Sequence, residues 1–203
     1  MEFVTRIIAG FAGSLTLQVP KSGTRPTSDR VREAIFSSLD ARNLLVGAHV
    51  LDLYAGSGAL GLEAASRGAA EVTLVERASS AARVCSANAR LVAARFETAG
   101  GARRGVPRGS APSIRVVAKA VATFLASASG PWDLVFLDPP YELGDAELAR
   151  ALELLVPRLS GGAVVVLERG ARSPLPPLPP RLDLDRSTAY GDTALHWLDT
   201  SDE

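Results

Sequence analysis

The sequence reads Val50-Leu51-Asp52-Leu53-Tyr54-Ala55-Gly56-Ser57-Gly58-Ala59-Leu60-Gly61 where an apolar run meets a glycine-rich turn. The run contains a carboxylate near its end, and residues 60–67 have the composition of a helix. This pattern predicts a strand, a tight turn and a helix whose N-terminal backbone N–H groups face any bound ligand. Gly56, Gly58 and Gly61 match the dinucleotide fingerprint, although a turn of this kind also occurs without a ligand.

Two acidic residues distinguish this turn from a nicotinamide site. Asp52 stands at the strand end, where it would repel the pyrophosphate of NAD but would hold a positively charged group. S-adenosylmethionine carries a sulfonium and an α-ammonium, so it suits such a turn. Glu76 ends the next apolar run, where a carboxylate can accept hydrogen bonds from both ribose hydroxyls. Together these residues favour S-adenosylmethionine as the cofactor.

Strands and helices alternate over most of the chain. Hairpins are expected near both ends, over 5–9 with 15–19 and over 182–190 with 193–198, the second turning at Gly191-Asp192. Thr27 or Ser28 is expected to cap a helix that buries Val31, Ile35 and Leu39. Between the hairpins, the patterns predict strands over 50–53, 72–75, 114–117, 134–137 and 163–167 and helices over 60–67, 79–95, 120–128 and 145–155.

This order predicts an α/β protein with a mostly parallel sheet, helices on both faces and an antiparallel edge. We expect an N-terminal hairpin extension over residues 1–26 and one main domain over residues 27–203. The glycine- and proline-rich segment 100–112 is expected to be a disordered loop. Ligands of such sheets bind at the carboxyl ends of the strands.

Composition narrows the class of protein. The chain of 203 residues is 47% hydrophobic, contains no apolar run of membrane-spanning length and has no signal peptide at its start. One cysteine and two histidines exclude an internal disulfide and leave too few ligands for a metal cluster of those residues. We therefore expect a monomeric cytoplasmic protein without a metal, in which Cys85 only packs.

The net charge is zero, but the charged residues are unevenly distributed and form two basic regions. Residues 21–32 contain four basic residues and one acid, and residues 83–115 contain seven arginines and one acid. Either region can meet an anionic polymer, or it can be a solvated face. Arg25, Arg30 and Arg32 are expected to point away from the apolar face of their helix and to contact RNA phosphates.

A second motif, Asp138-Pro139-Pro140-Tyr141, follows the strand over 134–137 and should face the same crevice as Asp52 and Glu76. Its prolines lack N–H donors, so the turn offers only acceptors, followed by an aromatic ring. An exocyclic amine of a nucleobase could donate its protons to Asp138 and the Pro139 carbonyl while the base stacks on Tyr141. This motif therefore predicts methyl transfer to a nucleobase amine.

At these residues the chain resembles the class I S-adenosylmethionine-dependent amino-methyltransferases. It is most similar to the RsmD type, the bacterial 16S ribosomal RNA guanine-N2 methyltransferases. The resemblance runs from about Thr5 to Leu198 and includes the segments 24–36, 61–69 and 190–193. It implies a Rossmann-like seven-stranded sheet and methylation of one guanine within the small ribosomal subunit. It also implies cofactor contacts from Asp52, Tyr54, Ala55, Gly56, Ser57, Gly58, Glu76, Arg77, Lys119, Ala120 and Asp138.

The chain departs from the family pattern at one of these positions. After the third strand the family usually carries an acid that holds the adenine amino group, whereas this sequence reads Ala118-Lys119-Ala120. Lysine offers no acceptor, so that contact must come from the backbone or be missing.

Three other functions share parts of this pattern. A DNA adenine or cytosine amino-methyltransferase would share Asp-Pro-Pro-Tyr, but it usually needs a separate target-recognition segment. An NAD-dependent oxidoreductase would share the glycines, but Asp52 and the Asp-Pro-Pro-Tyr motif argue against it. A non-catalytic RNA-binding module would have lost cofactor binding, which calorimetry would reveal.

Overall fold

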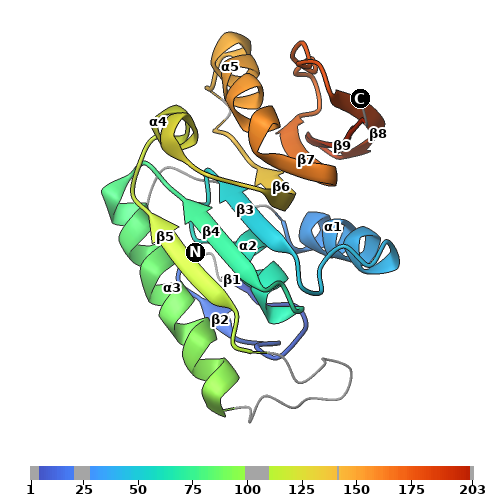
Figure 1. Cartoon of the computed structure of the whole chain (residues 1–203). Helices are drawn as coiled ribbons and strands as arrows, with labels where there is room; N and C mark the ends of the chain where they lie inside the picture. The colour runs from blue at the N-terminus through green and yellow to red at the C-terminus, as the bar shows by residue number, and fades with distance from the viewer. Residues whose placement is uncertain (1–4, 21–27, 99–109, 141, 202–203) are drawn as a thin grey trace.

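A seven-stranded sheet forms the centre of the computed structural model, which describes residues 5–20, 28–98, 110–140 and 142–201 (Figure 1). The first five strands across the sheet are parallel, and the last two add an antiparallel edge. In spatial order the strands are β5 (Ser113–Val117), β4 (Glu71–Val75), β3 (His49–Leu53), β6 (Trp132–Leu137), β7 (Leu159–Gly170), β9 (Thr193–Thr200) and β8 (Leu182–Tyr190). The predicted Rossmann-like fold class is confirmed.

Helices cover both faces of this sheet because its central strands are apolar on both sides. Val50 of β3 belongs to one core cluster together with residues of α1 (Asp29–Ala41), α2 (Ala59–Ser66) and α3 (Ser79–Thr98). Leu51 and Leu53 pack in a second cluster, with α4 (Val121–Ser127), α5 (Asp145–Leu155) and the 3-10 helix η1 (Val156–Arg158). None of the described helices is both long and apolar enough to cross a membrane.

Several boundaries match the predicted ones. The hydroxyl of Ser28 accepts a hydrogen bond of 3.3 Å from the N–H of Val31, so Ser28 is the N-cap of α1. The closing hairpin turns at Gly191-Asp192 as expected, with φ of 63° at Gly191. Segment 99–109, which includes most of the expected disordered loop, lies outside the described residues.

The N-terminal hairpin has shorter strands than the sequence predicts. Its strands are β1 (Thr5–Arg6) and β2 (Thr16–Leu17), which pair antiparallel. Ile7 still donates across the hairpin to the carbonyl of Leu15, at 2.9 Å. The next two N–H groups leave the hairpin: Ile8 and Ala9 donate to the carboxylate of Glu63 in α2, at 2.6 and 3.0 Å. Glu63 is fully buried, so the hairpin is fastened onto the main body.

The chain order places a switch point between β3 and β6. From β3 the chain builds outward to β4 and β5, and it then returns to add β6 on the other side of β3. Leu53 lies opposite Leu137 in this parallel pair, so both strands end at the same level. Ligand sites of doubly wound sheets lie at this edge, beside the switch point.

Candidate active site

The turn after β3 has the conformation that its glycines allow. Tyr54, Gly56 and Gly58 have φ of 65°, 56° and 80°, a region that side chains other than glycine rarely adopt. Gly58 is the N-cap of α2. Gly61 is required for a different reason, because a Cβ atom there would lie 2.4 Å from Cδ2 of Leu74. The turn therefore brings α2 tightly against β4.

Asp52 lies beneath this turn. Its side chain is 1% exposed, and its Oδ2 accepts a hydrogen bond of 2.9 Å from the N–H of Gly61. Burial raises the pKa of this carboxyl to about 7, with a further upward contribution from the charges of Asp138 and Glu76; the Gly61 bond opposes the shift. The carboxylate therefore fixes the turn from below, and direct contact with a cofactor stays a prediction.

Glu76 holds the turn from the side. Its Oε2 accepts a hydrogen bond of 3.0 Å from the N–H of Gly56, and its Oε1 accepts one of 2.7 Å from Ala78. Each carboxylate oxygen can accept more than one hydrogen bond, so lone pairs remain for ribose hydroxyls. The sequence indicated a ligand-binding role for Glu76 but gave no sign of its contact with Gly56.

The Asp-Pro-Pro motif begins where β6 ends. The N–H of Asp138 lies 3.5 Å from the carbonyl of Leu53, so the motif adjoins the glycine turn directly. Pro139 is buried, whereas Pro140 is exposed and its carbonyl accepts a bond from Leu143. Tyr141 lies outside the described residues. The structure thus brings the predicted carboxylate of β6 to the turn of β3.

Arg169 steadies the far end of the same loop. It lies in β7, beyond the part that pairs with β6 but opposite Ala194 of β9. Arg169 is 9% exposed and donates a hydrogen bond of 2.6 Å from Nη2 to Oδ1 of Asp145, the first residue of α5. Asp138 is therefore held by the end of β6, and Asp145 is held by this ion pair. Sequence reasoning missed Arg169, because no local pattern connects it to Asp145.

Three carboxylates consequently face one region at the carboxyl ends of β3, β4 and β6. Glu76 and Asp138 are both near enough to Asp52 for their charges to contribute to the raised pKa of that carboxyl, after its burial. Such a cluster favours a ligand with positive charge and disfavours a pyrophosphate. No group of His, Cys, Asp and Glu in the described parts of the chain is arranged to hold a metal. These residues fit a sulfonium cofactor.

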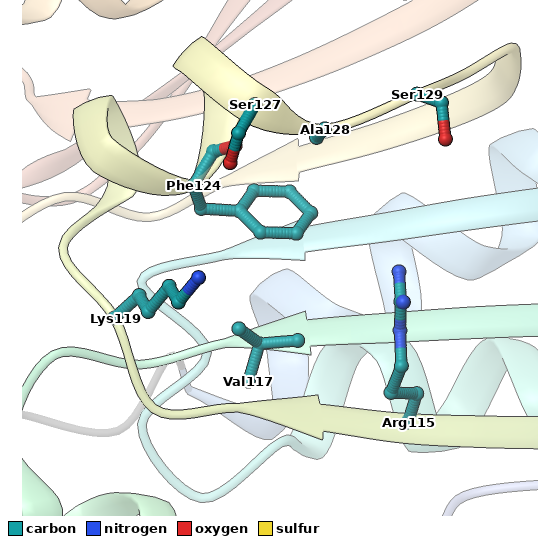
Figure 2. A pocket seen from close by; sticks show the side chains of 7 residues that line it. All are labelled: Arg115, Val117, Lys119, Phe124, Ser127, Ala128 and Ser129. Carbon is teal, nitrogen blue, oxygen red and sulfur yellow. The ribbon is translucent and has the colours of Figure 1, made fainter.

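Other predicted cofactor contacts lie at the border of this region. Arg77 is exposed and near enough to Tyr54 to affect its pKa, which burial and the charge of Glu147 raise to about 12. Ala120 is the N-cap of α4. The N–H of Lys119 donates to the carbonyl of Val117, and the Lys119 side chain lines a cavity on the α4 side of β5 (Figure 2). Cofactor contacts from these three residues stay predictions.

The predicted RNA contacts need one correction. Arg25 lies outside the described residues, and Arg30 is exposed. Arg32 was expected to face solvent, and this is wrong: it is fully buried, and its Nη2 donates to the carbonyl of Arg6 and to Asp29, at 2.9 and 2.6 Å. The reason is helical periodicity, since Arg32 lies one turn before Phe36 on the buried face of α1.

The sheet order, the glycine turn and the adjoining Asp-Pro-Pro loop define a Rossmann-like methyltransferase of class I. The chain belongs to the family described as Conserved hypothetical protein 95, whose family model matches residues 5–199. This is the family that the sequence resemblance indicated.

Named relatives agree with this assignment. The chain is 36% identical to Ribosomal RNA small subunit methyltransferase D of Escherichia coli, over 93% of this chain and 86% of the relative. It is 33% identical to the protein of the same name from Haemophilus influenzae, over 84% and 81% of the two chains.

Solved structures agree as well. The yhhF protein of Escherichia coli superposes with a TM-score of 0.79 at 32% identity, covering 99% of this chain and all of that one. The rRNA methyltransferase aviRa of Streptomyces viridochromogenes, at 18% identity and a TM-score of 0.68, covers 90% of this chain and 88% of its own, and it shares the fold.

Proposed function

We propose that this protein transfers a methyl group from S-adenosylmethionine to the exocyclic N2 amine of a guanine in small-subunit (16S) ribosomal RNA. One observation carries the proposal: the Asp138-Pro139 acceptor pair begins directly beside the glycine turn, with the Asp138 N–H 3.5 Å from the Leu53 carbonyl. A group that holds an amine thus adjoins a group that suits a sulfonium cofactor. The names of the relatives support a small-subunit RNA substrate.

The chemistry follows from the acceptors of the loop. The lone pair of an amine on a guanine ring is delocalised into the ring, which makes the nitrogen a poor nucleophile. The Asp138 carboxylate and the Pro139 carbonyl can each accept one N–H of the amine, which favours a pyramidal nitrogen with a directed lone pair. When bound, S-adenosylmethionine supplies an activated methyl group on its sulfonium. Positioning of this kind can contribute roughly 7–11 kcal/mol to a barrier.

The predicted cofactor residues would contact different parts of S-adenosylmethionine. Glu76 would bind the ribose hydroxyls, and the ionised Asp52 would attract the positive groups from beneath the turn. Tyr54, Ala55, Ser57 and Gly58 form the turn and would contact the cofactor there, Arg77 lies near Tyr54, and Ala120 at the N-terminus of α4 would add a contact from β5. The buried Pro139 and the Arg169–Asp145 pair would keep the loop from shifting when the base enters.

We further propose that the protein acts as a cytoplasmic monomer on RNA within the small ribosomal subunit, without a metal. Small subunits from a bacterial strain that lacks the gene would be incubated with the purified protein and S-adenosylmethionine labelled in its methyl group. Digestion of the RNA to nucleosides should place the label in N2-methylguanosine, and partial nuclease digestion should place it in one fragment of the RNA. Label in another nucleoside would overturn the guanine assignment. Cofactor binding without transfer to any nucleic acid would contradict the substrate class.

A further inference from the structure

A cavity of about 210 Å³ lies on the α4 side of β5, at the free edge of the sheet (Figure 2). Arg115 in β5 and Lys119 just beyond it both extend from the strand toward α4, with Val117 between them. The buried ring of Phe124 forms part of the wall, and the exposed Ser127 and Ser129 stand at the opposite side.

The cavity exists because α4 is too short to cover β5. Its seven residues span about 10 Å, whereas the five residues of β5 span about 16 Å. The chain leaves α4 at Ala128, whose carbonyl is fixed by a hydrogen bond of 2.9 Å from Nε of Arg158. The rim of the cavity is therefore a defined part of the structure.

The charge of the cavity is positive. Both cationic residues are exposed, and the lining includes no acidic residue. Among the described residues, neither Arg115 nor Lys119 forms a salt bridge, and Arg115 makes only a long hydrogen bond of 3.4 Å to the Thr73 hydroxyl. Two cations on either side of the apolar side chains of Val117 and Phe124 could each bind a phosphate of one RNA strand.

The surroundings favour a polymer over a small anion. α3 packs beside β5 on the opposite face of the sheet and presents Arg83, Arg90 and Arg95 to solvent. Exposed cations therefore lie on both sides of β5, where a polymer could contact more of them than a small anion could. Lys119 also stands two residues beyond Val117, at the level where the carboxyl ends of the strands meet. β5 and β6 are three strand positions apart, about 14 Å, so RNA held here could still reach the Asp138 loop.

We infer that Arg115 and Lys119 form a phosphate-binding site for the backbone of the substrate RNA, an inference that rests on the proposed function. This site gives Lys119 a role for which a lysine is suited. The Lys119 side chain, which replaces the usual acid, would contact RNA, and backbone groups would then bind the adenine amino group of the cofactor.

The test is the salt dependence of binding to small subunits that lack the methyl group. Removal of each cation that binds a phosphate should reduce the slope of log affinity against log salt by about 0.7, so Arg115→Gln should reduce it by about 0.7 and the double variant with Lys119→Gln by about 1.4. The charge-keeping pair Arg115→Lys and Lys119→Arg should retain the wild-type slope. Arg150→Gln is the matched control, because Arg150 is 63% exposed on α5 and pairs with Glu153.

Three results would overturn the inference. The first is an unchanged slope in the double variant while wild type binds and methylates the subunits. The second is weaker S-adenosylmethionine binding by Lys119→Gln with no change in the RNA slope, which would assign Lys119 to the cofactor. The third combines two measurements. If inorganic phosphate raised the melting temperature of wild type but not of the double variant, and if the double variant kept the wild-type salt slope for RNA, the cavity would be a site for small anions.

Failure of the proposed function would look different. If wild type bound RNA with the expected slopes but transferred no methyl group, the phosphate site would stand and the enzymatic proposal would fall. If wild type bound no RNA at any salt concentration, both would fall.

Discussion

Asn88 donates a hydrogen bond of 2.9 Å from Nδ2 to the carbonyl of Ser57, in the middle of the glycine turn. The same amide accepts a bond from the N–H of Gln18 and donates one to the Gln18 carbonyl, both at 2.9 Å. Asn88 lies in α3 and is fully buried. One side chain therefore connects the N-terminal hairpin to the turn that suits the cofactor.

Asn88→Ala should loosen both elements together. The change removes three hydrogen bonds to the backbone of Gln18 and Ser57, and each such bond contributes about 1 kcal/mol to stability. We expect a loss of about 3 kcal/mol in the free energy of unfolding, by denaturant titration, and weaker binding of S-adenosylmethionine by calorimetry. Ser86→Ala is the control, since among the described residues the Ser86 hydroxyl bonds to the Ala82 carbonyl, within the same helix. Unchanged cofactor affinity in a destabilised Asn88→Ala protein would mean that the glycine turn keeps its conformation without Asn88.

Asp138→Ala should abolish methyl transfer while cofactor affinity stays within a few-fold. A pre-organised contact to the reacting group is typically worth about 2.7–4 kcal/mol, or roughly a hundred- to thousandfold in rate. Single-turnover transfer to small subunits measures the effect. Asp133→Ala removes a carboxylate from the other end of β6, where it bonds to His49 and Ser160, and should reduce stability only. An Asp138→Ala protein with more than about a tenth of the wild-type rate would exclude the acceptor role.

Tyr141 offers a related prediction from the sequence. Tyr141→Ala should weaken capture of the base, because stacking on an aromatic ring is worth about 1–3 kcal/mol. Tyr141→Phe should retain activity, since stacking needs only the ring. The Michaelis constant for RNA in the two variants separates stacking from any role of the hydroxyl.

Glu76→Ala should raise the dissociation constant of S-adenosylmethionine at least tenfold, because a charged hydrogen bond is worth about 1.5–3 kcal/mol. The contacts with Gly56 and Ala78 add a loss of stability that ribose binding alone would not predict. Glu76→Gln retains an acceptor for one of these N–H groups but turns a donor toward the other. It should therefore bind the cofactor more weakly than wild type. Normal affinity in both variants would place the ribose elsewhere.

The sequence predicted the sheet, both hairpins and the meeting of Asp52, Glu76 and Asp138, because apolar periodicity and strand ends are local patterns. It did not predict contacts that join distant segments. Asn88 and Gln18 are separated by 70 residues, and no spacing rule connects them. The error at Arg32 had a different cause: the periodicity that identified Ile35 and Leu39 also places Arg32 on the buried face, but its charge suggested solvent.

The raised pKa of Asp52 makes both stability and cofactor affinity depend on pH. The folded pKa of about 7 exceeds the ordinary value of 3.8, so the folded protein binds more protons between these values than the unfolded chain does. The stability from protonated Asp52 is therefore complete below about pH 4 and lost as the pH rises to 7, at most about 1.4 kcal/mol per pH unit. A cationic cofactor prefers the ionised form, so its affinity should rise over the same window and level off above pH 7. Asp52→Asn should remove both dependences in denaturation and calorimetry across pH 5–8.

Arg32 and Arg30 allow a direct separation of scaffold from RNA surface within one helix. Arg32→Ala removes a buried guanidinium that holds the Arg6 carbonyl and Asp29, so it should destabilise the protein by about 3 kcal/mol. The slope of log affinity for small subunits against log salt should stay at the wild-type value, because a fully buried cation releases no counterions from RNA. Arg30→Ala should do the reverse, leaving stability unchanged and reducing the slope by about 0.7 if the exposed start of α1 contacts phosphate. A reduced slope in a still-folded Arg32→Ala protein would show that this side chain leaves the core when RNA binds.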